Sequence, residues 1–166
     1  IQRLSIIGTS LGGIMAMLMA SQQGERIHSV VLNDVGAQVS SEPVSRIAAY
    51  LDQARPVADW NEAVRTLRQN NEADFTNLSD DQWMAFARRL YSEQNGLVVP
   101  DFDPAIREQF QVQALDLWQP FDALRAIPTL LLRGANSDLL PADVVTAMQR
   151  AKPDLTAVTI PERGHA

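Results

Sequence analysis

The sequence predicts an α/β fold, in which a parallel β-sheet with helices on both faces is interrupted by a long helical segment. Short apolar runs typical of buried strands alternate with helical patterns near both ends of the 166-residue chain. Between them, the residues show helical periodicity and helix start signals instead. These observations predict three parts: sheet at 1–35, an all-helical cap at 36–126, and the rest of the sheet at 127–166.

The first part is a strand–helix–strand unit. Residues 4–7 are a short apolar run, which is typical of a strand buried on both faces of a parallel sheet. Residues 11–22 are apolar nearly all round and predict a buried helix. Residues 27–33 predict the second strand. Such a unit is expected to have a right-handed crossover.

The insertion is expected to consist of helices only. Apolar residues at 44, 47, 48 and 51 follow helical spacing. Three further helix starts are indicated by capping boxes or by aspartate followed by proline, at 59–62, 79–82 and 103–104. An insertion of about 90 residues in a compact domain is usually functional.

The strand and helix alternation returns in the third part. Residues 128–133 predict a buried strand that ends at a glycine, and residues 155–160 predict a last strand. Residues 142–152 predict the helix between them, which is entered through a proline.

Composition excludes several classes of protein. With 14 basic and 20 acidic residues the net charge is −6, which excludes a nucleic-acid-binding protein that acts through a basic surface. The chain has no cysteine and two histidines, which excludes a disulfide framework, a cysteine nucleophile and a histidine-rich metal site. No apolar run reaches about 18 residues, so we expect no membrane span and a cytoplasmic protein, with the oligomeric state open. Because the chain begins within a predicted strand, we expect further residues upstream.

Gly8, Ser10 and Gly12 form the pattern G-x-S-x-G. In a sharp strand-to-helix turn, a strained backbone exposes the serine hydroxyl, and the residues two before and two after must be small. The helix then points its N-terminus at the serine, and the Leu11 N–H can donate to an oxyanion. The alternative is a glycine-rich turn that holds a phosphate, but the position between strand and helix favours a nucleophile.

Asp138 and His165 each follow one of the later predicted strands. Sites in parallel sheets collect at the carboxyl ends of strands, so these side chains are expected near Ser10. Asp34 ends the strand at 27–33, and it is an alternative acid partner for His165 or a residue that lines the pocket. Asp138 alone could equally cap the helix that follows it.

The segments 7–13, 31–36, 131–134 and 163–166 resemble the α/β-hydrolase superfamily. More narrowly, they are similar to bacterial esterases, lactonases and carbon–carbon bond hydrolases with a helical cap. The resemblance implies Ser10 as nucleophile, His165 as base, Asp138 as acid and 36–126 as a lid. Family members carry further strands before the serine, a loop with a second oxyanion donor and a final helix. The resemblance therefore implies that the chain is the C-terminal part of a hydrolase.

The expected function is that of a serine hydrolase that cleaves a carboxylic ester or a related acyl compound, without metal or cofactor. The expected substrate is a small molecule with an apolar acyl or aryl group. The same three residues would also serve a carbon–carbon bond hydrolase or a cofactor-free perhydrolase or haloperoxidase. A ligand-binding protein with a silent triad, or an inactive fragment, are the alternatives of another class.

Overall fold

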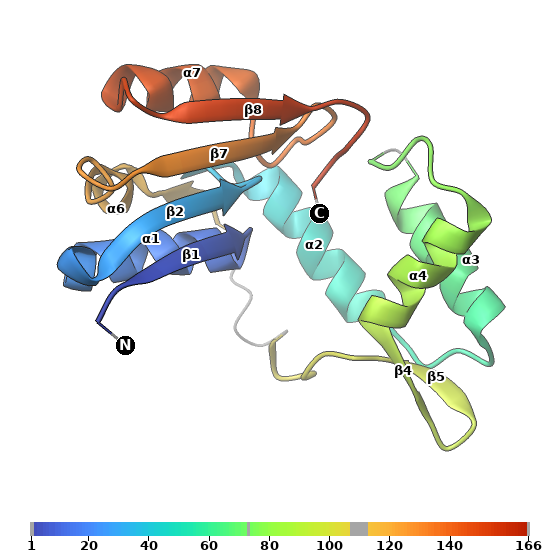
Figure 1. The fold of residues 1–166 in the computed structure, drawn as a ribbon. Coiled ribbons are helices and arrows are strands. Elements are labelled where there is room, and N and C mark those ends of the chain that lie inside the picture. Colours follow the sequence, from blue (N-terminus) through green and yellow to red (C-terminus); the bar gives the residue numbers. More distant parts are fainter. Residues whose placement is uncertain (1, 73, 107–112, 166) are drawn as a thin grey trace.

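Four strands form one parallel sheet in the computed structural model, which describes residues 2–72, 74–106 and 113–165 (Figure 1). The strands, in the spatial order of the sheet, are β1 (Leu4–Thr9), β2 (Ile27–Asn33), β7 (Thr129–Gly134) and β8 (Thr156–Ile160). All three pairings are parallel, so the carboxyl ends of the strands lie at one edge of the sheet. The predicted α/β class and the four predicted strands are confirmed.

Three helices pack with the sheet: α1 (Leu11–Gln23), α6 (Trp118–Asp122) and α7 (Ala142–Ala151). A short 3₁₀ turn, η1 (Gly24–Arg26), joins α1 to β2. The helices share one buried apolar cluster with Val30, Leu32 and Leu131 of the central strands. Burying these side chains is the main term that holds the sheet and helices together.

The two edge strands, β1 and β8, each have apolar side chains that are exposed on one face of the sheet. Ile7 is 77% exposed and Val158 is 42% exposed. The expectation that residues 4–7 form a strand covered on both faces is therefore wrong for the described residues. The physical reason is that alternate side chains of β1 point to opposite faces, and only the face of Ile6 packs against the main cluster of the described residues.

The segment between β2 and β7 contains α2 (Ser41–Gln53), α3 (Trp60–Asn71) and α4 (Asp80–Leu90). The α3 and α4 helices enclose a second apolar cluster with Leu67, Trp83 and Phe75 at its centre. Figure 1 shows α2 running between the sheet and this helix pair. The described residues therefore form two buried clusters, and the division at 36 and 126 stays a prediction.

Two of the three predicted helix starts are present. Asp59 accepts a hydrogen bond from the Glu62 N–H at the start of α3, and Ser79 with Gln82 forms a complete capping box at the start of α4. The third start shows two bonds, from the Ala105 N–H to the Asp103 carboxylate and from the Ile106 N–H to the Asp103 carbonyl. Most of the helix predicted after Asp103 lies outside the described residues.

The expectation of helices only in this segment is wrong. A hairpin of β4 (Tyr91–Gln94) and β5 (Leu97–Pro100) follows α4, and β3 (Gln38–Val39) pairs with β6 (Leu115–Asp116). The hairpin turn is Asn95-Gly96, with φ of 53° and 78°. Two consecutive positive φ angles match the right-handed twist of a hairpin, and Asn-Gly is the sequence that tolerates them best.

Candidate active site

Ser10 stands between the end of β1 and the start of α1, as predicted. Its backbone has φ 52° and ψ −119°, a strained conformation for a residue other than glycine. The Ser10 N–H donates to the Asn33 carbonyl at 3.1 Å, which ties the turn to the end of β2. The turn is therefore fixed by the sheet, and strain of this kind is typical of functional positions.

The two glycines of the pattern have different roles. A Cβ on Gly8 would lie 2.4 Å from the carbonyl carbon of Gly12, so a side chain at position 8 would collide with the backbone. A Cβ on Gly12 would meet nothing within 4 Å. The expectation that both positions must be small is right for Gly8 and wrong for Gly12, because Gly12 contributes its backbone to the close contact and its Cα faces open space.

Leu11 is the first residue of α1. No side chain caps this end of the helix, so the Leu11 N–H is left for another acceptor. Leu11 and Ser10 line the same cavity. The positive end of the helix dipole and an N–H beside the serine are the features that stabilise a negative oxygen.

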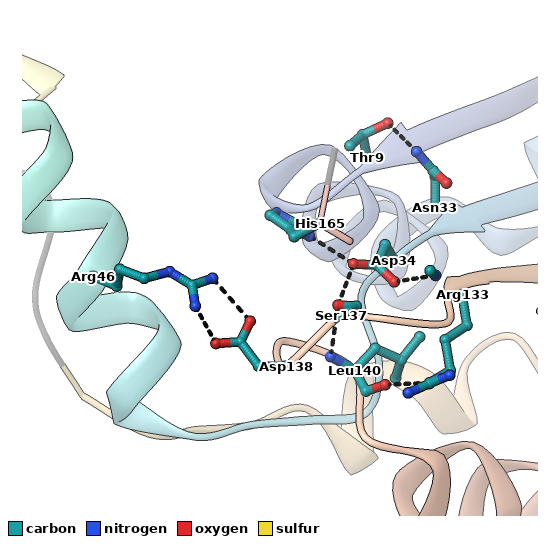
Figure 2. Close-up of polar contacts among 10 residues, drawn as sticks. Thr9, Asn33, Asp34, Arg46, Arg133, Ser137, Asp138, Leu140 and His165 are labelled. Atoms are coloured by element: carbon teal, nitrogen blue, oxygen red, sulfur yellow. Dashed lines mark hydrogen bonds and ion pairs between the residues drawn. The ribbon is translucent and has the colours of Figure 1, made fainter. Parts of the chain in front are cut away.

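Asp34 follows β2 and turns back toward β7 with a positive φ of 54°. It is 2% exposed, and its carboxylate accepts three hydrogen bonds (Figure 2). The Gly134 N–H donates to Oδ1 at 2.8 Å, and the Ser137 hydroxyl donates to Oδ2 at 2.5 Å. Nδ1 of His165 lies 2.8 Å from the same Oδ2. Three hydrogen-bonding partners fix the orientation of this buried carboxylate.

His165 follows β8 on a loop that is tied to two neighbouring segments. The Gly164 N–H donates to the Asp74 carbonyl at 2.7 Å, and the Asn136 N–H donates to the Arg163 carbonyl at 2.8 Å. The imidazole is largely buried, and its Nδ1 contacts a carboxylate. This arrangement places the proton of a neutral imidazole on Nδ1 and leaves Nε2 as the acceptor.

Asp138 does not contact His165. Its carboxylate is bound by both terminal nitrogens of Arg46 from α2, with Nη2 at 2.9 Å from Oδ1 (Figure 2). This hydrogen bond raises the pKa of Arg46 above its ordinary value. The expected pairing of Asp138 with His165 is thus corrected to the alternative, Asp34. The reason is the path of the loop after β7, which turns Ser137 toward Asp34 and leaves Asp138 half exposed.

Two cavities lie near the carboxyl edge of the sheet. One of about 360 Å³ is lined by Ser10 and mainly by apolar side chains, among them Ile14, Val44 and Leu139. The other, of about 270 Å³, is lined by His165 and mainly by polar side chains. Ile47 of α2 lines both cavities. A serine and a histidine that border adjoining cavities are the elements of a nucleophilic site.

Several residues of this site were not predicted. Ser137, Asp74 and Arg46 carry no motif, and their roles depend on how loops and α2 approach the sheet edge. Asp34, by contrast, was named as an alternative acid, and aspartate is among the residues that tolerate its positive φ. Among the described residues, no group of three or more histidine, cysteine or acidic side chains could hold a metal ion, and no helix is long and apolar enough to cross a membrane.

Comparisons with known proteins agree with this geometry. The model of the alpha/beta hydrolase family matches residues 1–166. The chain is 28% identical over 179 residues to a 3-hydroxybutyrate-oligomer hydrolase of Cupriavidus necator, covering 100% of this chain and 60% of that protein. A crystal structure of an alpha/beta hydrolase from Novosphingobium aromaticivorans superposes with a TM-score of 0.92 at 38% identity, covering 100% of this chain and 60% of that one.

A third similarity shows the fold alone. E-2-(acetamidomethylene)succinate hydrolase has a TM-score of 0.81 at 21% identity, covering 99% of this chain and 60% of that one. The chain thus spans about three fifths of the length of the relatives that it matches. The match of the family model over residues 1–166, with the sheet and the serine turn described above, shows that the chain belongs to the alpha/beta hydrolase family.

Proposed function

We propose that the protein is a serine hydrolase that cleaves carboxylic esters with Ser10, His165 and Asp34. The observation that carries the proposal is the 2.8 Å contact between His165 Nδ1 and the buried Asp34 carboxylate, at the same sheet edge as a serine with a strained backbone. A histidine oriented by a carboxylate is the base that activates a serine.

The steps follow from the atoms of these three residues. Nε2 of His165 takes the proton of the Ser10 hydroxyl while the serine oxygen attacks the ester carbonyl carbon. The protonated imidazole is stabilised by Asp34 and then gives its proton to the leaving alcohol. Water attacks the acyl-enzyme by the same route, and the carboxylic acid leaves. The Leu11 N–H supplies one hydrogen bond to the oxyanion in both halves of the reaction.

The apolar cavity supports an ester with an apolar acyl group. Ser10 lies at its wall, so the acyl group bound to the serine would extend among Ile14, Val44 and Leu139. The similarity to a hydrolase named for 3-hydroxybutyrate oligomers also favours an ester bond as the one that is cleaved. The protein is proposed to act on a small molecule and to need no cofactor.

The test is the Ser10→Ala variant with p-nitrophenyl butyrate and with a fluorophosphonate probe. We expect labelling to be lost and kcat to fall by about 10⁶-fold, as when the nucleophile of a triad is removed. Ser45→Ala is the matched control, because this exposed hydroxyl on α2 donates to the Ser41 carbonyl of its own helix and does not line the cavity beside Ser10.

Two results would contradict the proposal. Unchanged ester turnover in Ser10→Ala would remove the serine from the mechanism. A parent protein that cleaves a vinylogous diketone and leaves esters intact would assign the same residues to carbon–carbon bonds.

A further inference from the structure

The helix α2 presents different side chains to the two cavities. Val44 and Ile47 face the apolar cavity beside Ser10. Arg46, Tyr50 and Gln53 follow one another at helical spacing along the polar cavity beside His165. One helix therefore separates an apolar space at the nucleophile from a polar space at the base.

The reaction gives these two spaces different occupants. The acyl group stays on the serine, whereas the alcohol must lie next to the nitrogen that protonates it. If Ser10 and His165 act as proposed above, on which this inference rests, the acyl side is apolar and the alcohol side is polar. We propose that the polar cavity binds the leaving alcohol, and that this alcohol is uncharged and carries at least one further hydroxyl group.

The charges around the polar cavity favour an uncharged group. Arg46 contributes a cation to its lining, and both terminal nitrogens of that guanidinium already bind Asp138. Asp74 contributes a carboxylate to the same lining. A leaving group with its own carboxylate would thus meet a cation that is already paired and a second negative charge.

The remaining lining supplies hydrogen-bonding groups that suit hydroxyls. Asn70, Asn71 and Gln53 each bring a side-chain amide. Nδ2 of Asn71 donates to the Leu67 carbonyl at 2.8 Å, which holds the amide in place and leaves its oxygen as an acceptor. Amides donate and accept at once, and so do hydroxyl groups, so each pairing satisfies both partners.

The experiment compares three butyrate esters that form the same acyl-enzyme: propyl, 2,3-dihydroxypropyl and 3-carboxypropyl butyrate. With kcat/KM divided by the alkaline hydrolysis rate of each ester, we expect the dihydroxypropyl ester to be preferred over propyl by about tenfold, the effect of one or two hydrogen bonds. We expect the 3-carboxypropyl ester to be the poorest substrate.

The variants Asn70→Leu and Gln53→Leu should each reduce the preference for the dihydroxypropyl ester by about three- to tenfold. Deacylation of the butyryl-enzyme, read from the burst with p-nitrophenyl butyrate, should stay unchanged because the alcohol has already left. Gln69→Leu is the control, since Gln69 is an exposed amide on α3 that does not line the cavity.

The possible outcomes distinguish a failure of this inference from a failure of the proposed serine hydrolase function. Turnover that depends on Ser10 but shows the same ester preference in parent and variants overturns this inference alone. A preference for the 3-carboxypropyl ester overturns the inference that the leaving alcohol is uncharged. It would mean that Arg46 binds the carboxylate of the leaving group. No Ser10-dependent turnover of any ester overturns the proposed function and this inference together.

Discussion

The loops after β2 and β7 each bring an aspartate to the same edge of the sheet, and the two carboxylates have opposite environments. Asp34 is 2% exposed and accepts hydrogen bonds from a backbone N–H, a hydroxyl and an imidazole. The side chain of Asp138 is 42% exposed and pairs with Arg46. Both residues lie at the site because each follows a strand of the sheet. They differ in burial, and the buried Asp34 is the one that contacts His165.

The difference arises in the backbone. Asp34 has a positive φ, which turns its side chain back toward the end of β7. In the β7 loop, Ser137 is buried against Asp34 while its neighbour Asp138 points outward to α2. Two consecutive side chains of this loop therefore point in opposite directions, Ser137 into the protein and Asp138 toward its surface. A carboxylate that orients a histidine must be held rigidly, and only Asp34 has the bonds for that.

The largest expected effect is that of Asp34→Asn. The amide keeps the shape but can donate to Nδ1, which favours the wrong tautomer of His165. We expect kcat for p-nitrophenyl butyrate to fall by about 10³- to 10⁴-fold. Circular dichroism and thermal unfolding would verify that the variant is folded.

The matched control is Asp138→Asn. An exposed ion pair contributes less than about 1 kcal/mol, so we expect kcat to change by less than about fivefold. Adding salt to the parent protein should change kcat in the same direction as Asp138→Asn, because salt screens the ion pair of Arg46 with Asp138. A large loss in Asp138→Asn with little loss in Asp34→Asn would return the role of acid to Asp138.

The expected effect of Ser137→Ala is smaller than that of Asp34→Asn. This variant removes one hydrogen-bond donor from the Asp34 carboxylate. Hydrogen bonds to charged groups contribute roughly 1.5–3 kcal/mol, so we expect kcat to fall by about 10- to 100-fold with little change in KM. Steady-state kinetics and urea unfolding would be measured together. Lower stability with unchanged kcat would mean that Gly134 and His165 orient Asp34 without the hydroxyl.

The sequence was sufficient for the sheet and for most helices because these depend on local patterns. The apolar run of β2 and the capping box of Ser79 with Gln82 are each readable within a few residues. The hairpin at Asn95-Gly96 was missed although its turn signal was present, since the neighbouring helix signals outweighed it. The open face of β1 could not be predicted, because the exposure of a face depends on which distant elements pack against it.

The sequence predicted which strand ends carry the residues of the site. It did not predict which of these side chains contact one another. Ser10, His165 and both aspartates lie at the expected edge of the sheet. The choice between Asp34 and Asp138 depends on φ at one residue and on the direction of Ser137, and neither follows from spacing along the chain. The contact of Gly164 with Asp74 joins residues 90 positions apart and has no local signal.

A third carboxylate near the site is intermediate between these two cases. Asp74 is partly buried beside the polar cavity, and burial raises the pKa of its carboxyl above the ordinary value of 3.8. Arg46 lowers that pKa and Asp138 and Asp34 raise it, but burial is the largest cause. The charged form of Asp74 is thus less favourable in the folded chain than in the unfolded chain.

The smallest expected effect is a pH-dependent gain in stability from Asp74→Asn. Between pH 3.8 and the raised pKa of Asp74, the unfolded chain has lost the proton that the folded chain keeps, so the stability of the parent falls as pH rises. The asparagine variant lacks this loss. Its Tm relative to the parent should therefore increase through that window and stay constant above it, in thermal unfolding from about pH 3.5 to 7. If the parent becomes the more stable protein at neutral pH, attraction to Arg46 outweighs burial, and Asp74 is a paired carboxylate like Asp138.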